Sequence, residues 1–84
     1  MEALLLSRLG ESLRQLRTQR GLTQAQLADL AGLTRRMIVQ IEQGRATVAV
    51  RAYVAAAEAM GAELTVVPVR RPTLDEVRKV LADD

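Results

Sequence analysis

The sequence predicts an all-α fold class, a domain of five helices with one β-strand near its C-terminus. Three observations lead to this prediction. Leucines recur at helical spacing early in the chain, a glycine follows each of the first four expected helices, and the apolar pattern changes after Gly61. The 84 residues, 49% of them apolar, suffice for one small domain that oligomerisation would stabilise further.

The first helix is expected to begin at about residue 3 or 7 and to end at residue 19, before Gly21. Its core-facing residues are Leu6, Leu9, Leu13 and Leu16. Gly10 lies inside this helix, where glycine costs about 1 kcal/mol relative to alanine. Either another segment packs closely against Gly10, which we favour, or the helix fits the sequence poorly there.

Two short helices joined by a tight turn are expected over residues 23–44. Thr23 can accept a backbone N–H at the start of the first, and Gln26 can return the bond, which makes a capping box. Gly32 can adopt the positive φ that ends a helix, and Thr34 can cap the second. The core-facing residues are expected to be Leu27, Leu30, Met37, Ile38 and Ile41. This layout is typical of a helix-turn-helix that reads DNA.

A fourth helix is expected over about residues 48–60, with Thr47 as the preferred cap and Gly61 as the stop. Its expected core-facing residues are Val50, Tyr53, Val54, Ala57 and Met60. Tyr53 is the only aromatic residue of the chain, and we interpret it as a core residue rather than a platform for stacking bases.

Residues 64–69 are apolar and β-branched, which predicts a strand, and Pro68 restricts it to the edge of a sheet. A single strand leaves its backbone groups unpaired, so we expect it to pair with the same strand of a second copy. The predicted homodimer interface consists of Leu64, Val66, Val67 and Val69. The alternative is an extended arm packed on the chain's own helices.

A second capping box, from Thr73 to Glu76, opens a short amphipathic fifth helix. Its apolar side consists of Leu74, Val77, Val80 and Leu81. A helix this short is marginal alone, so it must dock on the dimer, dock on a partner or fray. The expected organisation is a DNA-binding domain over 1–62, a dimerisation strand over 63–69 and a tail over 70–84.

Charge is distributed unevenly along the chain. The whole chain carries a formal +2, but residues 8–51 hold eight arginines and three acidic residues, a net of +5. Residues 52–84 hold four basic and six acidic residues, a net of −2. A basic helical half that faces phosphate is typical of a small DNA-binding module, and the alternative is an arginine surface that is only solvated.

Several function classes are disfavoured by residues that the sequence lacks. It has no cysteine and no histidine, so it offers neither a disulfide framework nor the usual base and metal ligand. We therefore expect no enzyme, no cofactor and no metal site. The longest N-terminal apolar stretch, residues 3–6, is too short for a secretory or membrane segment, which predicts a cytoplasmic protein without membrane contact.

A set of residues between positions 16 and 44 stands at fixed offsets from one another. They are Leu16, Arg17, Gly21, Leu22, Thr23, Gln24, Leu27, Ala28, Gly32, Leu33, Thr34, Ile38, Ile41, Glu42, Gln43 and Gly44. With this pattern, the chain resembles the Cro and phage-repressor (XRE) family of helix-turn-helix domains from about residue 9 to 61. The resemblance implies a lambda-repressor-like fold that binds a palindromic operator in double-stranded DNA.

The start of a recognition helix enters the major groove, where arginine can bond both acceptors of guanine and glutamine can bond adenine. Arg35, Arg36 and Gln40 fit this chemistry, and the resemblance implies that they and Thr34 approach base edges. For Arg35, a phosphate contact is the alternative.

Phosphate contacts are expected from Gln24 at the start of the first motif helix, where the helix dipole favours an anion, and from Gln43 and Arg45 beside the second. The alternative for each is an ordinary exposed polar residue. The resemblance also implies a structural ion pair between Arg17 and Glu42, which would tie the first helix to the end of the third.

The strand and tail resemble those of small HipB-type antitoxins, dimers that repress their own operon and hold a kinase-like toxin. We therefore expect a sequence-specific dimeric transcriptional repressor, such as an autoregulating antitoxin, with or without a toxin partner. The alternative is a protein-interaction module on the same scaffold. The outward arginines and glutamine disfavour it, because a protein-binding face would carry apolar anchors.

Overall fold

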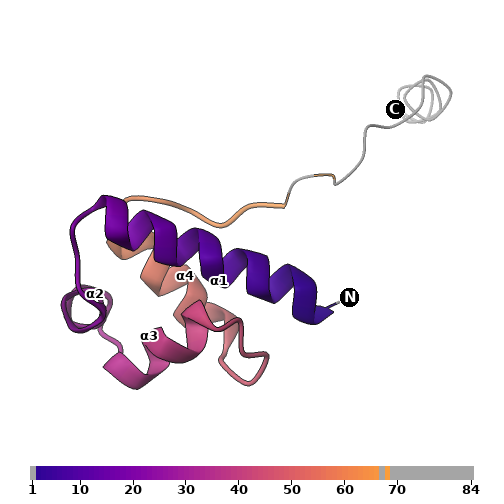
Figure 1. Cartoon of the computed structure of the whole chain (residues 1–84), viewed down its shortest axis with the longest axis horizontal. Helices are drawn as coiled ribbons and strands as arrows, with labels where there is room; N and C mark the ends of the chain where they lie inside the picture. Colours follow the sequence, from indigo (N-terminus) through magenta and orange to yellow (C-terminus); the bar gives the residue numbers. More distant parts are fainter. Residues whose placement is uncertain (1, 67, 69–84) are drawn as a thin grey trace, which may run out of the picture.

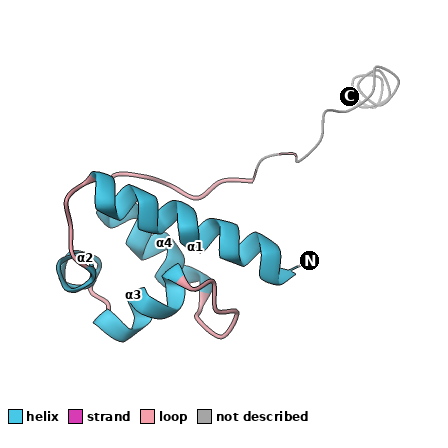
Figure 2. Cartoon of the chain, in the orientation of Figure 1, coloured by secondary structure: helices cyan, strands magenta, loops and turns pink. Residues whose placement is uncertain are grey.

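The computed structural model describes residues 2–66 and 68. This part of the chain contains four helices, α1 (Glu2–Gln19), α2 (Gln24–Ala31), α3 (Arg35–Glu42) and α4 (Val50–Ala59). The long α1 crosses one side of the group formed by the three shorter helices (Figure 1). Contacts join α2 to α3 and α4, and α3 also packs against α1 and α4. The described residues therefore form one helical bundle, and loops connect its helices (Figure 2).

The turn between α2 and α3 is built as the sequence predicts. Thr23 Oγ1 accepts the N–H of Gln26 at 3.0 Å, and Gln26 Oε1 accepts the N–H of Thr23 at 2.8 Å, so the capping box is present. Gly32 ends α2 with a φ of +70°. Thr34 Oγ1 then accepts the N–H of Met37 at 3.1 Å and caps α3. Local hydrogen bonds at both helix ends thus set the direction of α3 relative to α2.

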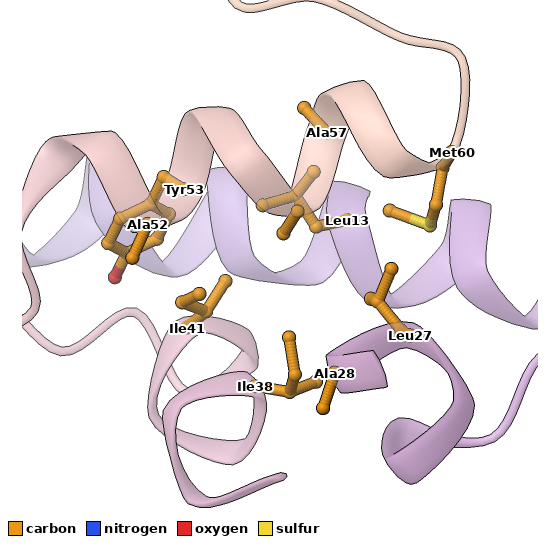
Figure 3. Close-up of a cluster of buried hydrophobic side chains, with 10 residues drawn as sticks. Leu13, Leu27, Ala28, Ile38, Ile41, Ala52, Tyr53, Ala57 and Met60 are labelled. Atoms are coloured by element: carbon orange, nitrogen blue, oxygen red, sulfur yellow. The ribbon is translucent and has the colours of Figure 1, made fainter. Parts of the chain in front are cut away.

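Side chains from all four helices form the core (Figure 3). The largest fully buried residues are Leu27, Ile38, Ile41 and Tyr53. Burying one such side chain stabilises the folded state by about 1.5–3 kcal/mol. The two isoleucines lie on the inner side of α3, which leaves its opposite side to solvent.

The close packing expected at Gly10 is confirmed. A Cβ placed on Gly10 would lie 2.5 Å from the carbonyl oxygen of Ile41 and 2.8 Å from that of Glu42. A second close approach occurs at Gly44, whose φ is +71° and whose Cβ would lie 2.7 Å from the backbone of Leu6. The backbone of α1 therefore lies directly against the end of α3 and the loop that follows it.

Two residues expected in the core are exposed. The exposed fraction is 61% for Leu30 and 74% for Val50, so both predictions were wrong. In α2 the packed stripe passes through Leu27 and Ala28, which places Leu30 at its edge. In α4 the buried face includes the small residues Ala52 and Ala56, beside Tyr53, Ala57 and Met60, and Val50 lies in the first turn, to one side of it.

The expected cap of α4 was also wrong, whereas the start of the helix lies within two residues of the expected position. The helix begins at Val50, two residues later than expected, and its N-cap is Ala49 rather than Thr47. Ala49 has no side chain that can accept a hydrogen bond, so no side-chain cap closes this end. The carbonyl of Ala49 accepts the N–H of Ala52 at 3.0 Å. The first turn is therefore tight, and the backbone alone forms it.

The predicted strand does not occur within residues 2–66 and 68. Residues 64–66 and 68 are loop, while Val67, Val69 and the tail helix expected over 70–84 lie outside the described residues. Leu64 packs against the core, whereas Val66 is 97% exposed. The pairing of this segment with a second copy stays a prediction. The fifth helix, expected over residues 70–84, also stays a prediction.

Candidate nucleic-acid interface

The solvent-facing side of α3 carries the residues expected to read bases. Thr34 caps the helix, Arg35 and Arg36 follow in its first turn, and all three are exposed. Gln40 is half-buried and lies one turn after Arg36 on the same face. Since Ile38 and Ile41 hold the opposite face in the core, these polar side chains project from a fixed helix.

Arg17 and Glu42 form a bidentate ion pair between α1 and the end of α3. Arg17 Nε donates to Glu42 Oε2 at 2.6 Å and Nη2 donates to Oε1 at 3.1 Å. Their side chains are 12% and 6% exposed. Hydrogen bonding to Glu42 raises the pKa of Arg17 above its usual value, although burial acts in the opposite direction. Arg17 Nη1 also donates to the carbonyl of Leu22 at 2.9 Å, so the guanidinium joins three segments.

Gln24 joins this cluster, which sequence analysis missed. Its Nε2 donates to Glu42 Oε1 at 3.1 Å, and the residue is half-buried at the start of α2. One amide hydrogen is therefore directed to Glu42, and the other is left for a further acceptor. No local pattern predicts this bond, because it joins residues 18 positions apart. Through it, the expected phosphate ligand is tied to the end of α3.

The loop after α3 carries the other two expected phosphate ligands. Gln43 and Arg45 are exposed, and Arg45 Nε donates to Gln43 Oε1 at 3.2 Å. The N–H of Arg45 donates to the carbonyl of Gln40 at 3.0 Å. The two side chains therefore lie beside each other next to the last turn of α3.

Tyr53 has a polar contact that sequence analysis did not assign. It is 2% exposed, as expected for a core residue, but its hydroxyl donates to the carbonyl of Arg45 at 2.8 Å. Burial raises the pKa of this phenol. The sequence does contain a signal for such a contact. Tyr53 is the only aromatic residue of the chain and was expected in the core, and a buried tyrosine hydroxyl usually has a hydrogen-bond partner.

A family model described as a helix-turn-helix domain matches residues 8–69, more than half of the chain. The chain belongs to the helix-turn-helix family. In this helix-turn-helix protein α2 and α3 are the two motif helices, and the second of them, α3, is the candidate recognition helix. A search of curated proteins finds no match for the chain.

The family and the exposed polar face of the recognition helix together support DNA binding by this helix-turn-helix protein. Among the described residues, no helix is long and apolar enough to cross a membrane. The same part of the chain contains no cluster of three or more acidic residues placed to hold a metal ion.

Proposed function

We propose that the chain is a sequence-specific transcriptional repressor that binds its operator as a homodimer. The observation that carries this proposal is the pair of exposed arginines in the first turn of α3, on a helix whose other face is fixed in the core. A rigid helix that presents guanidinium groups at its N-terminal end fits the geometry of major-groove reading.

Each polar residue of the recognition helix has a distinct role in this proposal. Arg36 and Gln40, one turn apart, face the base edges, where they bond guanine and adenine respectively. Thr34 lies at the front of the helix and also approaches the bases. Arg35 lies at the flank of the same face and contacts either a base edge or the nearest phosphate.

Phosphate contacts at both sides of the recognition helix fix its register on the duplex. Gln24 reaches one phosphate with its remaining amide hydrogen, at the N-terminus of α2, where free N–H groups also face an anion. Gln43 and Arg45 reach the backbone from the loop after α3. Such contacts contribute affinity that depends on salt and little on sequence.

Titration of DNA from upstream of the gene in a gel-shift assay, at several salt concentrations, tests the proposal. We expect saturable binding to a palindrome whose half-sites lie roughly 34 Å apart, with a steep loss of affinity as salt rises. Equal affinity for a scrambled sequence of the same composition would contradict sequence-specific reading.

Arg36→Ala tests the assignment of the reading residues. We expect it to weaken operator binding by about 1–3 kcal/mol, roughly 5- to 150-fold, and to relax the preference at one base pair. The matched control is Arg8→Ala, which removes the same charge from an exposed position on the outer side of α1. If both variants weaken operator and scrambled DNA alike, Arg36 does not read a base.

The antitoxin role is the most specific form of this proposal, and it rests on the resemblance of the strand and tail to HipB-type antitoxins. It predicts an adjacent reading frame that encodes a kinase-like protein, which co-purifies with the full chain. Purification of the chain from its own cells without such a partner would restrict the proposal to a repressor.

A further inference from the structure

The loop between α3 and α4 carries exposed Gln43 and Arg45, and hydrogen bonds and close packing hold its backbone. The exposed residues of this loop are Gln43, Arg45, Ala46, Thr47 and Ala49. A flexible loop would lose conformational entropy when it binds DNA, and this loss reduces the affinity. Contacts that already order this loop in the free protein should therefore increase its affinity for DNA.

Arg45 is held at three points. Its N–H donates to Gln40 of α3 at 3.0 Å, and its Nε donates to Gln43 Oε1 at 3.2 Å. Its carbonyl accepts the Tyr53 hydroxyl at 2.8 Å, and the N–H of Val48 reaches the same oxygen only at 3.5 Å. The tyrosine bond is therefore the shorter of the two bonds that hold this carbonyl.

Tyr53 is well suited to hold the loop in place. It belongs to α4 and is 2% exposed, and its ring lies in the core cluster with the oxygen at the margin (Figure 3). Its hydroxyl is directed at a backbone carbonyl rather than at a side chain, so the bond fixes the path of the loop itself. A leucine or phenylalanine would fill the same core position without this bond.

We propose that Tyr53 is a positioning residue for DNA binding: its buried hydroxyl fixes the backbone of Arg45, so that the Arg45 guanidinium is already placed for a phosphate. The inference rests on the proposed function, because it assumes that the face of α3 meets DNA. It adds to that function a residue that does not touch DNA and acts only through Arg45.

Tyr53→Phe, Arg45→Gln and the double variant test the inference. Operator affinity is measured at several salt concentrations, well below the melting temperature of every variant. We expect Arg45→Gln to reduce the slope of log K against log salt by about 0.9, the loss of one phosphate contact. Tyr53→Phe should lower affinity by about two- to tenfold and reduce the slope by part of the same amount.

The inference is tested by whether the affinity losses of Tyr53→Phe and Arg45→Gln add in the double variant. If Tyr53 acts through Arg45, the double variant binds no more weakly than Arg45→Gln alone. A Tyr53→Phe protein with wild-type affinity and salt slope would overturn the inference, as would losses that add fully in the double variant. An unchanged slope in Arg45→Gln would overturn it too.

These outcomes are distinguishable from failure of the proposed function. If the wild-type chain does not discriminate operator from scrambled DNA, the function fails before Tyr53 is considered. If discrimination and the Arg36→Ala effect are present but Tyr53 and Arg45 are not coupled, only the positioning role fails. Arg8→Gln, matched to Arg45→Gln in charge, should leave the salt slope unchanged.

Discussion

Glu42 accepts hydrogen bonds from two other segments, Arg17 of α1 and Gln24 of α2. It is the last residue of α3, so both bonds act on the end of the recognition helix. Its own side chain is 6% exposed, which excludes most of the water that would weaken these bonds. The orientation of α3 relative to α1 and α2 thus depends on one carboxylate that is almost fully buried.

Glu42→Ala should lower the free energy of unfolding by about 3 kcal/mol, because Arg17 would keep its charge in a largely buried position without a counter-charge. Urea denaturation followed by circular dichroism measures the change. The control is Glu11→Ala, which breaks the exposed pair with Arg14 at 3.4 Å, and we expect a loss below about 1 kcal/mol. Equal losses in the two variants would contradict the structural role of Glu42.

At the scale of the element, α1 and α3 approach closely because α1 has a glycine at their crossing. The carbonyls of Ile41 and Glu42 occupy the space that a Cβ on Gly10 would need. A helix-interior glycine is unfavourable by itself, so the close crossing must offset that cost. The same crossing brings Arg17, about two turns further along α1, within reach of Glu42.

Gly10→Ala should destabilise the protein by about 1–3 kcal/mol, although alanine favours the helix by about 1 kcal/mol. The added methyl group would have to displace backbone atoms, which cannot move as a flexible side chain can. Ser12→Ala, at an exposed position of the same helix, is the control and should have a small stabilising effect. A Gly10→Ala protein that melts higher than wild type would show that the crossing is loose.

The start of α4, which has no side-chain cap, offers a substitution that should stabilise the protein. Ala49 has an extended backbone, with φ −61° and ψ 143°, which suits a capping residue. Ala49→Ser should therefore raise stability by about 1 kcal/mol, since its hydroxyl can accept a first-turn N–H. Thermal unfolding measures the gain against Ala46→Ser in the preceding exposed loop, for which we expect a change within about 0.5 kcal/mol. Equal melting temperatures would mean that the first turn cannot take a cap.

The elements that the sequence predicted well are those fixed by neighbouring residues. The Thr23 capping box, the Thr34 cap and the Gly32 turn each depend on a few adjacent positions, and all three are present. Leu30 and Val50 were misplaced because burial depends on which face packs against the other helices. The bonds of Gln24 to Glu42 and of Tyr53 to Arg45 join different elements, so no local pattern contains them.

At the scale of the whole molecule, the proposed function requires two copies of the chain. A twofold homodimer would place two recognition helices on successive major grooves, which a single copy cannot do. Leu64 packs against the core, while Val66, two residues further on, is 97% exposed. An apolar side chain this exposed, at the end of the described bundle, supports pairing through this segment.

Val66→Lys should convert the dimer to a monomer, because a charge on the pairing segment would oppose its own copy across the twofold axis. Sedimentation velocity should give about twice the 9.2 kDa chain mass for wild type and a single chain mass for the variant. Thr65→Lys adds the same charge to the neighbouring exposed residue and should remain dimeric. An unchanged mass for Val66→Lys would place the interface elsewhere.

The contact of Gly44 with the start of α1 bears on where the protein can be cut. The family match begins at residue 8, but the Gly44 backbone rests on that of Leu6 and Ser7. A fragment trimmed to the family boundary would remove this support from the segment that carries Arg45. Such a fragment would retain the polar face of α3 yet present a less ordered flank, so minimal versions for spectroscopy or engineering should keep the first turns of α1.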